Sequence, residues 1–274
     1  SAEECSAKGE VYGLNHLSYF KSITLNGREI MEELIENDEA YVKTDMRYFE
    51  KELLKERGGI LNEYLYYFYY REKAVENILN AKQTRGEQIC EINKKMTEAL
   101  STIDIENNFD EAFKVFEYWY GIRENNYMAS ETGVKRQEPW HFDIYQKDFG
   151  GYAAVALNFI EIAQSNATDS MILCVPNNGA IKELEDTDVI EVTCDITENG
   201  AVPHKFDNLD EQNIELIRRV KIYERLASKA IREKSVQCAV EALTLHPLVN
   251  SYSLAKKLVS EYLKLNKNYT GDWK

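Results

Sequence analysis

Three residues of this chain could do chemistry together: a histidine, a tyrosine and an arginine, at positions 16, 64 and 85. Six aromatic side chains lie between Tyr64 and Tyr70. If this run is helical, its rings point all round the helix, so most of it must be buried. Because a buried phenol needs a hydrogen-bond partner, we expect one tyrosine of this run to have a chemical role, with Arg85 close to it. The alternative is a tyrosine-rich core helix without a chemical role.

A polar pair, Asn15 and His16, stands between two leucines just after Gly13. Gly13 permits a tight bend, and the flanking leucines indicate that the pair is half buried. Buried polar groups need partners, and a neutral imidazole held in this way is a good metal ligand. The alternative is a core histidine whose ring bonds to a backbone carbonyl group.

The elements that must position these residues are mainly helices, because apolar residues recur at helical spacing along most of the chain. We expect helices over residues 30–54 (one or two helices), 64–70, 85–100, 110–120, 150–163, 216–230, 236–243 and 254–265. Asp210 is the expected N-cap of the helix through 216–230, and Pro247 ends the helix after it. The alanine-rich helix over 150–163 is expected to be central, because alanine lets backbones pack closely.

Two stretches predict strands. Met171–Val175 is apolar, and Val189–Ile196 alternates between apolar and polar residues. The sequence Pro176–Gly179 supplies a turn after the first of them, and the polar stretch Tyr127–Glu138 is expected to be a loop. Since no linker or repeat interrupts the chain, residues 1–274 predict one compact, helix-rich domain with a small sheet.

Composition narrows the classes of function. The formal net charge is −14, and an acidic surface repels phosphate backbones, so nucleic acid is not an expected partner. No apolar run approaches the roughly 18 residues of a membrane span. The five cysteines include no CxxC pair, which favours a reducing cytoplasm over a disulfide framework. Neither a GxGxxG nor a GxxxxGK[ST] motif is present, so nothing in this sequence cradles a dinucleotide or a nucleoside triphosphate.

Five stretches, in this order along the chain, resemble motifs of glycoside hydrolase family 4. They are Gly13–Ser18 (GLNHLS), Glu63–Tyr67 (EYLYY), Arg85–Ile92 (RGEQICEI), Val175–Ile181 (VPNNGAI), and Tyr223–Leu226 (YERL) with His246–Leu248 (HPL). The resemblance runs from about Val11 to about Tyr269. Within the family, GLNHLS and YLYYF are most similar to the 6-phospho-β-glucosidases.

The resemblance implies a mechanism in which NAD and a divalent metal replace the usual pair of carboxylates. NAD⁺ takes a hydride from C3 of the sugar, and the resulting ketone makes the C2 proton acidic. The metal, usually Mn²⁺, polarises the oxygens at C2 and C3. A tyrosine removes the C2 proton, the aglycone is eliminated, water adds, and NADH returns the hydride.

Carried over to this sequence, the resemblance makes His16 a metal ligand and Tyr64 the catalytic base. Arg85 would hold the region of the base or the substrate, and Asn15 would contact the substrate. The NAD site and the second metal ligand are expected to lie outside this chain.

The resemblance also implies a fold and a place in a larger enzyme. The fold would be α+β, with helices packed against a small, mostly antiparallel sheet, as in the C-terminal domains of lactate and malate dehydrogenases. Residues 1–274 would form the C-terminal substrate-binding and oligomerisation domain of a 6-phospho-β-glucosidase whose N-terminal NAD-binding Rossmann domain is absent from this chain. We therefore expect the chain alone to be inactive.

The expected partners are a phosphorylated disaccharide or glucoside and further copies of the chain in a dimer or tetramer. Two alternatives remain open. One is an α-glycosidase of the same family, acting on a phosphorylated α-glucoside or α-galactoside, because Asn62-Glu63-Tyr64 is similar to the SEY version of the motif. The other is a non-catalytic module that only oligomerises or binds.

Overall fold

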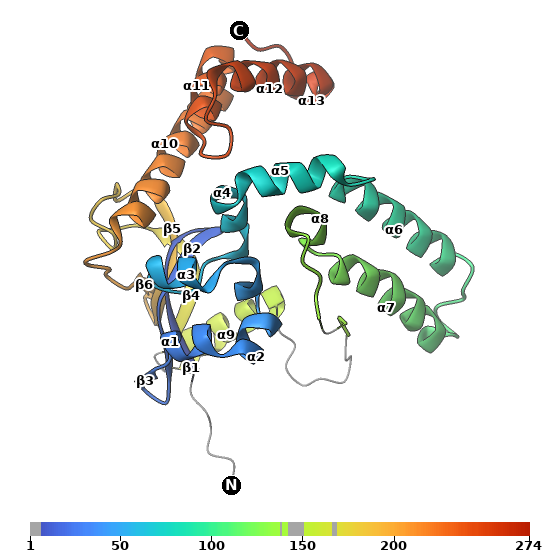
Figure 1. Cartoon of the computed structure of the whole chain (residues 1–274), viewed down its shortest axis with the longest axis horizontal. Coiled ribbons are helices and arrows are strands. Elements are labelled where there is room, and N and C mark those ends of the chain that lie inside the picture. The colour runs from blue at the N-terminus through green and yellow to red at the C-terminus, as the bar shows by residue number, and fades with distance from the viewer. Residues whose placement is uncertain (1–6, 138, 142–150, 166–168) are drawn as a thin grey trace.

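The computed structural model describes residues 7–137, 139–141, 151–165 and 169–274. Within these ranges the chain forms an α+β fold that is rich in helices (Figure 1). The predicted fold class is confirmed, with one difference: there are two small antiparallel sheets, each of three strands, instead of one.

Each sheet is a meander of consecutive strands. The strands are β1 (Ala7–Leu14), β2 (Leu17–Leu25), β3 (Arg28–Glu29), β4 (Asp169–Pro176), β5 (Val189–Thr197) and β6 (Gly200–Pro203). The two sheets meet where β1 lies against β5. There the backbone N–H of Val11 donates to Thr193 Oγ1 at 2.9 Å, and the Thr193 hydroxyl donates to the Gly9 carbonyl oxygen at 3.3 Å.

Helices make up most of the remaining described chain. They are α1 (Met31–Glu36), α2 (Asp38–Lys43), α3 (Lys51–Glu56), α4 (Tyr66–Tyr69), α5 (Arg71–Asn80), α6 (Arg85–Leu100), α7 (Phe109–Asn125), α8 (Ala129–Thr132), α9 (Gly151–Ser165), α10 (Glu211–Glu233), α11 (Val236–Leu245), α12 (Tyr252–Leu265) and α13 (Lys267–Thr270), with 3₁₀ turns η1 (Asp45–Tyr48) and η2 (Glu63–Leu65). Asp210 caps α10 as predicted, since its carboxylate accepts from the N–H groups of Gln212 and Asn213. No described helix is both long and apolar enough to cross a membrane.

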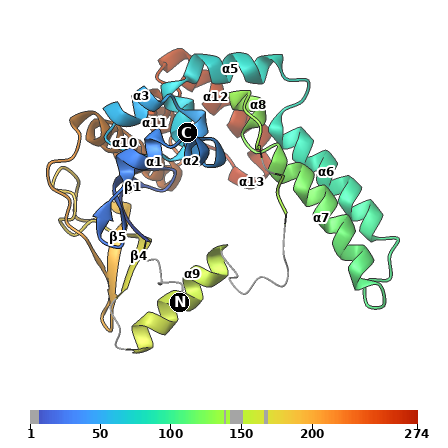
Figure 2. The same ribbon diagram turned by 60° about the horizontal axis from the view of Figure 1, so that its bottom comes forward.

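Two helical arms leave the body formed by the sheets and the N-terminal helices. α6 and α7 lie side by side and project to one side, whereas α10 leads away from the sheets and carries α11, α12 and α13 at its far end (Figures 1 and 2). The main core contains side chains from both sheets, from α3 and from α10, among them Tyr19, Leu54, Val192 and Ile217. A separate, smaller core around Val240, Ala255 and Val259 joins α11 to α12.

The aromatic run over 64–70 is not a single helix, contrary to the prediction. It is divided between η2 and α4, and Tyr70, at φ −123° and ψ 39°, breaks the helix before α5 begins. Its side chains also differ in burial, from Tyr66 at 2% exposure to Phe68 at 37%. The run is therefore partly a core element and partly a surface element.

Two further local predictions are wrong. α9 contributes no buried residue, and Tyr152 and Leu157 are 96% and 63% exposed, so this helix is not central. The expected loop over 127–138 contains the short helix α8. Gly150 and Glu138, the ends of these two predictions, lie outside the described residues.

Candidate functional site

His16 stands at the tip of the hairpin formed by β1 and β2. Leu14 pairs with Leu17, so Asn15 and His16 are the two residues of the turn. His16 adopts a left-handed conformation at φ 64°. Gly13 makes the turn possible: its φ is 141°, and an added Cβ would lie 2.3 Å from the Leu17 carbonyl oxygen. Both turn residues are exposed, so the prediction of a half-buried pair is wrong, because a two-residue turn leaves little chain to cover it.

A short extended segment after α3 runs along β2 and leads directly to the tip. The N–H of Phe20 donates to the Ile60 carbonyl oxygen at 3.0 Å, and the N–H of Asn62 donates to the Ser18 carbonyl oxygen at 3.1 Å. Gly59 allows this approach, since a Cβ there would lie 2.5 Å from the Phe20 carbonyl oxygen. These two backbone hydrogen bonds therefore position η2 beside the hairpin tip.

Tyr64 lies in η2 and contacts His16. The side chain of Asn62 accepts from the N–H of Tyr64 at 3.0 Å and so begins the turn. The rings of His16 and Tyr64 meet edge to face, with centroids 4.5 Å apart. Two of the residues singled out in the sequence, 48 positions apart, are thus in direct contact.

The hydroxyl of Tyr64 bonds to a residue that the sequence analysis missed, Tyr127. The two phenolic oxygens are 2.9 Å apart, and the Tyr127 oxygen is also 3.1 Å from Glu63 Oε1. Burial raises the pKa of Tyr127 well above its ordinary range, and the hydrogen bond with Tyr64 and the charge of Glu63 raise it further. Tyr127 is therefore a neutral phenol with one proton, which can point to Glu63 or to Tyr64 but not to both.

Nothing in the sequence marked Tyr127, because it follows α7 in a polar stretch without a motif. Glu63 lay within the EYLYY stretch but had no assigned role. We call Asn15, His16, Glu63, Tyr64 and Tyr127 the hairpin-tip site.

Arg85 is the first residue of α6, and its position follows from local sequence. Thr84 and Glu87 form a capping box at this end of the helix. Arg85 Nη2 donates to the Arg123 carbonyl oxygen at 2.8 Å, while Nη1 is buried and has no partner among the described residues. A buried N–H without an acceptor is costly, and a ligand oxygen would satisfy it.

Arg85 approaches the hairpin-tip site through Tyr67. The rings of Tyr64 and Tyr67 are stacked with centroids 6.4 Å apart. Burial raises the pKa of Tyr67, and the charge of Arg85 opposes this increase, so the guanidinium lies within electrostatic reach of that phenol. No contact joins Arg85 to Tyr64 in the described part of the chain.

The other side of the hairpin tip faces the second sheet. Burial raises the pKa of the Cys174 thiol on β4, and the nearby side chain of Asn15 opposes this increase. Cys174 is paired with Glu191 on β5. Burial raises the pKa of Glu191, while the charge of His16 and a hydrogen bond with Ser18 oppose it. Glu191 therefore lies within electrostatic reach of His16.

A metal ion would need ligands beyond those described here. No group of three or more His, Cys, Asp or Glu side chains in the described ranges could hold one. His16 nevertheless suits one nitrogen ligand, because its ring is exposed at a turn and makes no hydrogen bond within these ranges. The donor set present therefore fits part of a metal site.

Known proteins match the chain along most of its length. The model of the family 4 glycosyl hydrolase C-terminal domain matches residues 11–249. Over 94% of its length, the chain is 25% identical both to a probable 6-phospho-beta-glucosidase of Bacillus subtilis and to the maltose-6'-phosphate glucosidase MalH of Clostridium acetobutylicum. It covers 53% and 55% of these two proteins, so it spans about half their length.

Solved structures share the fold. The 6-phospho-beta glucosidase of Thermotoga maritima, determined with NAD and glucose-6-phosphate, gives a TM-score of 0.68 at 25% identity over 96% of this chain and 55% of that one. A 6-phospho-alpha-glucosidase from gut microorganisms, in complex with NAD and Mn²⁺, gives 0.65 at 19% identity over 97% of this chain and 56% of that one. The second likeness shows the fold alone.

Proposed function

Because the chain belongs to the family 4 glycosyl hydrolase C-terminal domain family, we propose that it is the substrate-binding part of an NAD- and divalent-metal-dependent 6-phospho-β-glucosidase. The observation that carries the proposal is the contact between His16 and Tyr64, with the Tyr64 hydroxyl bonded onward to Tyr127. A purely structural tyrosine would not need an exposed imidazole on one side and a phenol–carboxylate pair on the other.

In the proposed reaction, Tyr64 accepts the proton from C2 of the oxidised sugar. The neighbouring groups give that proton a destination. As Tyr64 accepts it, its own proton can pass to the Tyr127 oxygen, and the Tyr127 proton can pass to the Glu63 carboxylate. Each phenol then remains neutral, and Glu63 ends as the carboxylic acid. General-base catalysis of this kind contributes about 10²–10⁴-fold to rate.

The other residues would bind and orient. His16 would supply a nitrogen ligand to a divalent metal, which when bound stabilises negative charge on the sugar oxygens. The unpartnered Nη1 of Arg85 would donate to a substrate oxygen, and Asn15 would contact the substrate beside His16. NAD would bind outside this chain, as a hydride acceptor and donor at C3.

The test is Tyr64→Phe in the complete enzyme. We expect kcat to fall by about 10²–10⁴-fold, with a small change in melting temperature, because one hydrogen bond contributes only about 1 kcal/mol. Tyr66→Phe is the matched control. Tyr66 is two residues away, and its buried hydroxyl has no partner among the described residues, so its removal should leave kcat unchanged. Near-normal activity in Tyr64→Phe would mean that this tyrosine only packs and is not the catalytic base.

A second candidate is an α-glycosidase of the same family. It is favoured by the maltose-6'-phosphate glucosidase of Clostridium acetobutylicum, which is as similar to this chain as the β-glucosidase of Bacillus subtilis. Assays of the complete enzyme on paired α- and β-linked glucoside 6-phosphates would decide between them, and turnover of the α-anomer alone would overturn the β assignment.

We also propose that residues 1–274 act as a substrate-binding and oligomerisation domain of a cytoplasmic enzyme, and that this chain by itself is inactive. Exposed apolar side chains on α9 and on α12 support self-association, among them Tyr152, Leu157 and Leu265. Light scattering on the purified chain at micromolar concentration should show a dimer or a tetramer. A monomer in that experiment, or hydrolysis by this chain alone, would contradict these proposals.

A further inference from the structure

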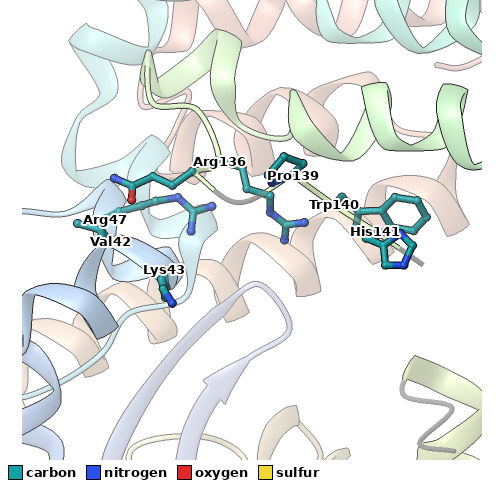
Figure 3. Close-up of a pocket in the computed structure, with 8 residues that line it drawn as sticks. Val42, Lys43, Arg47, Arg136, Pro139, Trp140 and His141 are labelled. Atoms are coloured by element: carbon teal, nitrogen blue, oxygen red, sulfur yellow. The ribbon is translucent and has the colours of Figure 1, made fainter. Parts of the chain in front are cut away.

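A second, positively charged site lies beside η1. It is a cleft of about 320 Å³, at the lower end of the size range of ligand pockets. Lys43 and Arg47 line it from the end of α2 and from η1, and Arg136, Trp140 and His141 line it from the chain after α8 (Figure 3). The guanidinium groups of Arg47 and Arg136 point to the same side (Figure 3). We call these five residues the basic cleft.

The charge of the cleft is opposite to that of the chain. The chain carries −14, yet Lys43, Arg47 and Arg136 bring three positive charges to one small space. Three nearby carboxylates offset them in part: Asp45 lies 3.2 Å from Arg47 Nη2, Glu39 lies 3.0 Å from Lys43 Nζ, and Glu117 lies 2.6 Å from His141 Nδ1. None of the three is among the described residues that line the cleft, where the polar side chains are those of Lys43, Arg47, Arg136, Gln137 and His141.

Arg47 is held in place by two of its three guanidinium nitrogens. Its side chain is 10% exposed. Nη1 donates to the Thr44 carbonyl oxygen at 2.7 Å, and Nη2 donates to the Tyr48 hydroxyl at 2.8 Å. The Nε–H is buried and has no partner in the described part of the chain. A fixed guanidinium with an unsatisfied N–H is prepared for an anionic acceptor.

We propose that the basic cleft binds a phosphate monoester dianion, with Arg47 and Arg136 as its donors. Arginine suits phosphate because its charged N–H groups make strong hydrogen bonds to phosphate oxygens; the fork of Arg136 can make two in parallel, and Arg47 would donate from Nε. Lys43 adds a point charge, and Trp140 gives one wall an apolar face that suits the organic part of a sugar phosphate. Binding at this cleft requires neither NAD, metal nor turnover, so it does not depend on the proposed function, which only suggests the sugar phosphate used as a probe.

The cleft is linked electrostatically to the hairpin-tip site. The charges of Arg47, Glu63 and Arg136 all act on Asp45. Glu63 in turn bonds to Tyr127 and through it to Tyr64. The charge of a dianion in the cleft would therefore act on Asp45, and through Asp45 on Glu63, which bonds to Tyr127.

The experiment is calorimetric titration of this chain with glucose 6-phosphate, inorganic phosphate and glucose. Wild type should bind the two phosphates saturably and glucose not at all. Equal affinity for both phosphates would identify free phosphate as a sufficient ligand, while tighter binding of glucose 6-phosphate would identify the sugar phosphate. Because Arg85 at the other site could also bind a phosphate, either result supports the cleft only when the cleft variants below weaken the binding. The absence of saturable phosphate binding at millimolar concentration would overturn the proposal.

Arg136→Gln locates the binding. Arg136 is exposed, so its loss should not affect folding. Loss of a charged hydrogen bond predicts a decrease in affinity of about tenfold or more. Lys135→Gln is the matched control, because it makes the same change in charge one residue away and does not line the cleft. It should weaken binding less than about twofold, which is the effect expected of general screening.

Arg47→Lys gives a second, independent variant. It keeps the positive charge and removes the guanidinium group with its Nε–H. We expect phosphate binding to weaken several-fold while the circular dichroism spectrum stays unchanged. Equal effects of Arg136→Gln and Lys135→Gln, or unchanged affinity in Arg47→Lys, would show that the cleft is not the site. None of these outcomes depends on whether Tyr64→Phe abolishes turnover.

Discussion

The hairpin-tip site and the basic cleft are built in different ways. At the hairpin tip, backbone hydrogen bonds between distant segments bring His16 and Tyr64 into contact, and two glycines permit the approach. In the basic cleft, side-chain charges from α2, from η1 and from the chain after α8 converge, and within the described residues no backbone hydrogen bond joins η1 to the chain after α8. Substitutions that distort the backbone should therefore damage the hairpin-tip site, whereas substitutions that remove a positive charge should damage the basic cleft.

The largest expected effect comes from Gly13→Ala. The added Cβ would lie 2.3 Å from the Leu17 carbonyl oxygen at a φ of 141°, so the hairpin tip must distort. We expect a loss of about 2–3 kcal/mol in the free energy of unfolding, measured by urea denaturation, and loss of turnover in the complete enzyme. Phosphate binding in the basic cleft should persist in the folded protein.

Gly86→Ala is the control for this substitution. Gly86 lies in the first turn of α6, and a Cβ there meets nothing within 4 Å. Alanine should be neutral or should stabilise the chain by up to about 1 kcal/mol. If Gly13→Ala proved equally harmless, the geometric account of the hairpin tip would be wrong.

A smaller effect is expected from Tyr127→Phe, which removes the hydroxyl between Tyr64 and Glu63. If the phenol pair passes a proton, kcat in the complete enzyme should fall by about 10–100-fold, with little change in melting temperature. The variant Glu63→Gln should have a similar effect, and the double variant should be hardly worse than either single one, because both changes interrupt the same path. Independent, multiplying effects would argue against the relay.

The smallest effect is expected from His204, which lies between the two sheets. His204 bridges the two sheets, with Nδ1 3.2 Å from Glu10 and Nε2 2.9 Å from Asp195. Burial lowers the pKa of His204, but the hydrogen bonds with Asp195 and Glu10 outweigh burial and raise it above its ordinary value. Since a raised pKa means tighter proton binding in the folded state, this stabilisation is fully present below about pH 6.5 and disappears as the pH rises through the folded-state pKa.

His204→Gln should therefore lower the melting temperature more at pH 6.0 than at pH 8.5. The Asp195 side chain is 47% exposed, so solvent screens the pair and the difference should correspond to less than about 1 kcal/mol. Scanning calorimetry at the two pH values measures it. An equal decrease at both would mean that the imidazole only packs between the sheets.

The helices that the sequence predicted best are those with local signals. α6 begins and ends at the predicted residues, and a capping box of Thr84 and Glu87 fixes its first turn, while α10 begins at its predicted cap. The prediction for 150–163 was wrong because helical periodicity reports an apolar helix but not what covers it. The helix breaks at Tyr70 without a proline or glycine, so the local sequence contained no signal for the break.

The candidate site residues divide in the same way. His16, Tyr64 and Arg85 were marked by motifs, although the placement of Tyr64 beside His16 depends on pairing between β2 and the segment 59–62. Tyr127 and Arg136 belong to no motif, and only the folded chain brings them to their partners. Spacing along a sequence does not encode contacts between residues 63 positions apart, such as Tyr64 and Tyr127.

The hydrogen bond from Asn62 to Ser18 makes the hairpin and the turn η2 one mechanical unit. Because two backbone bonds tie residues 60 and 62 to β2, a force applied at the imidazole of His16 would move the phenol of Tyr64 with it. A ligand gripping the histidine would thereby damp the motion of the tyrosine as well. The stiffness of the turn, as much as its chemistry, would then depend on whether the hairpin tip is occupied.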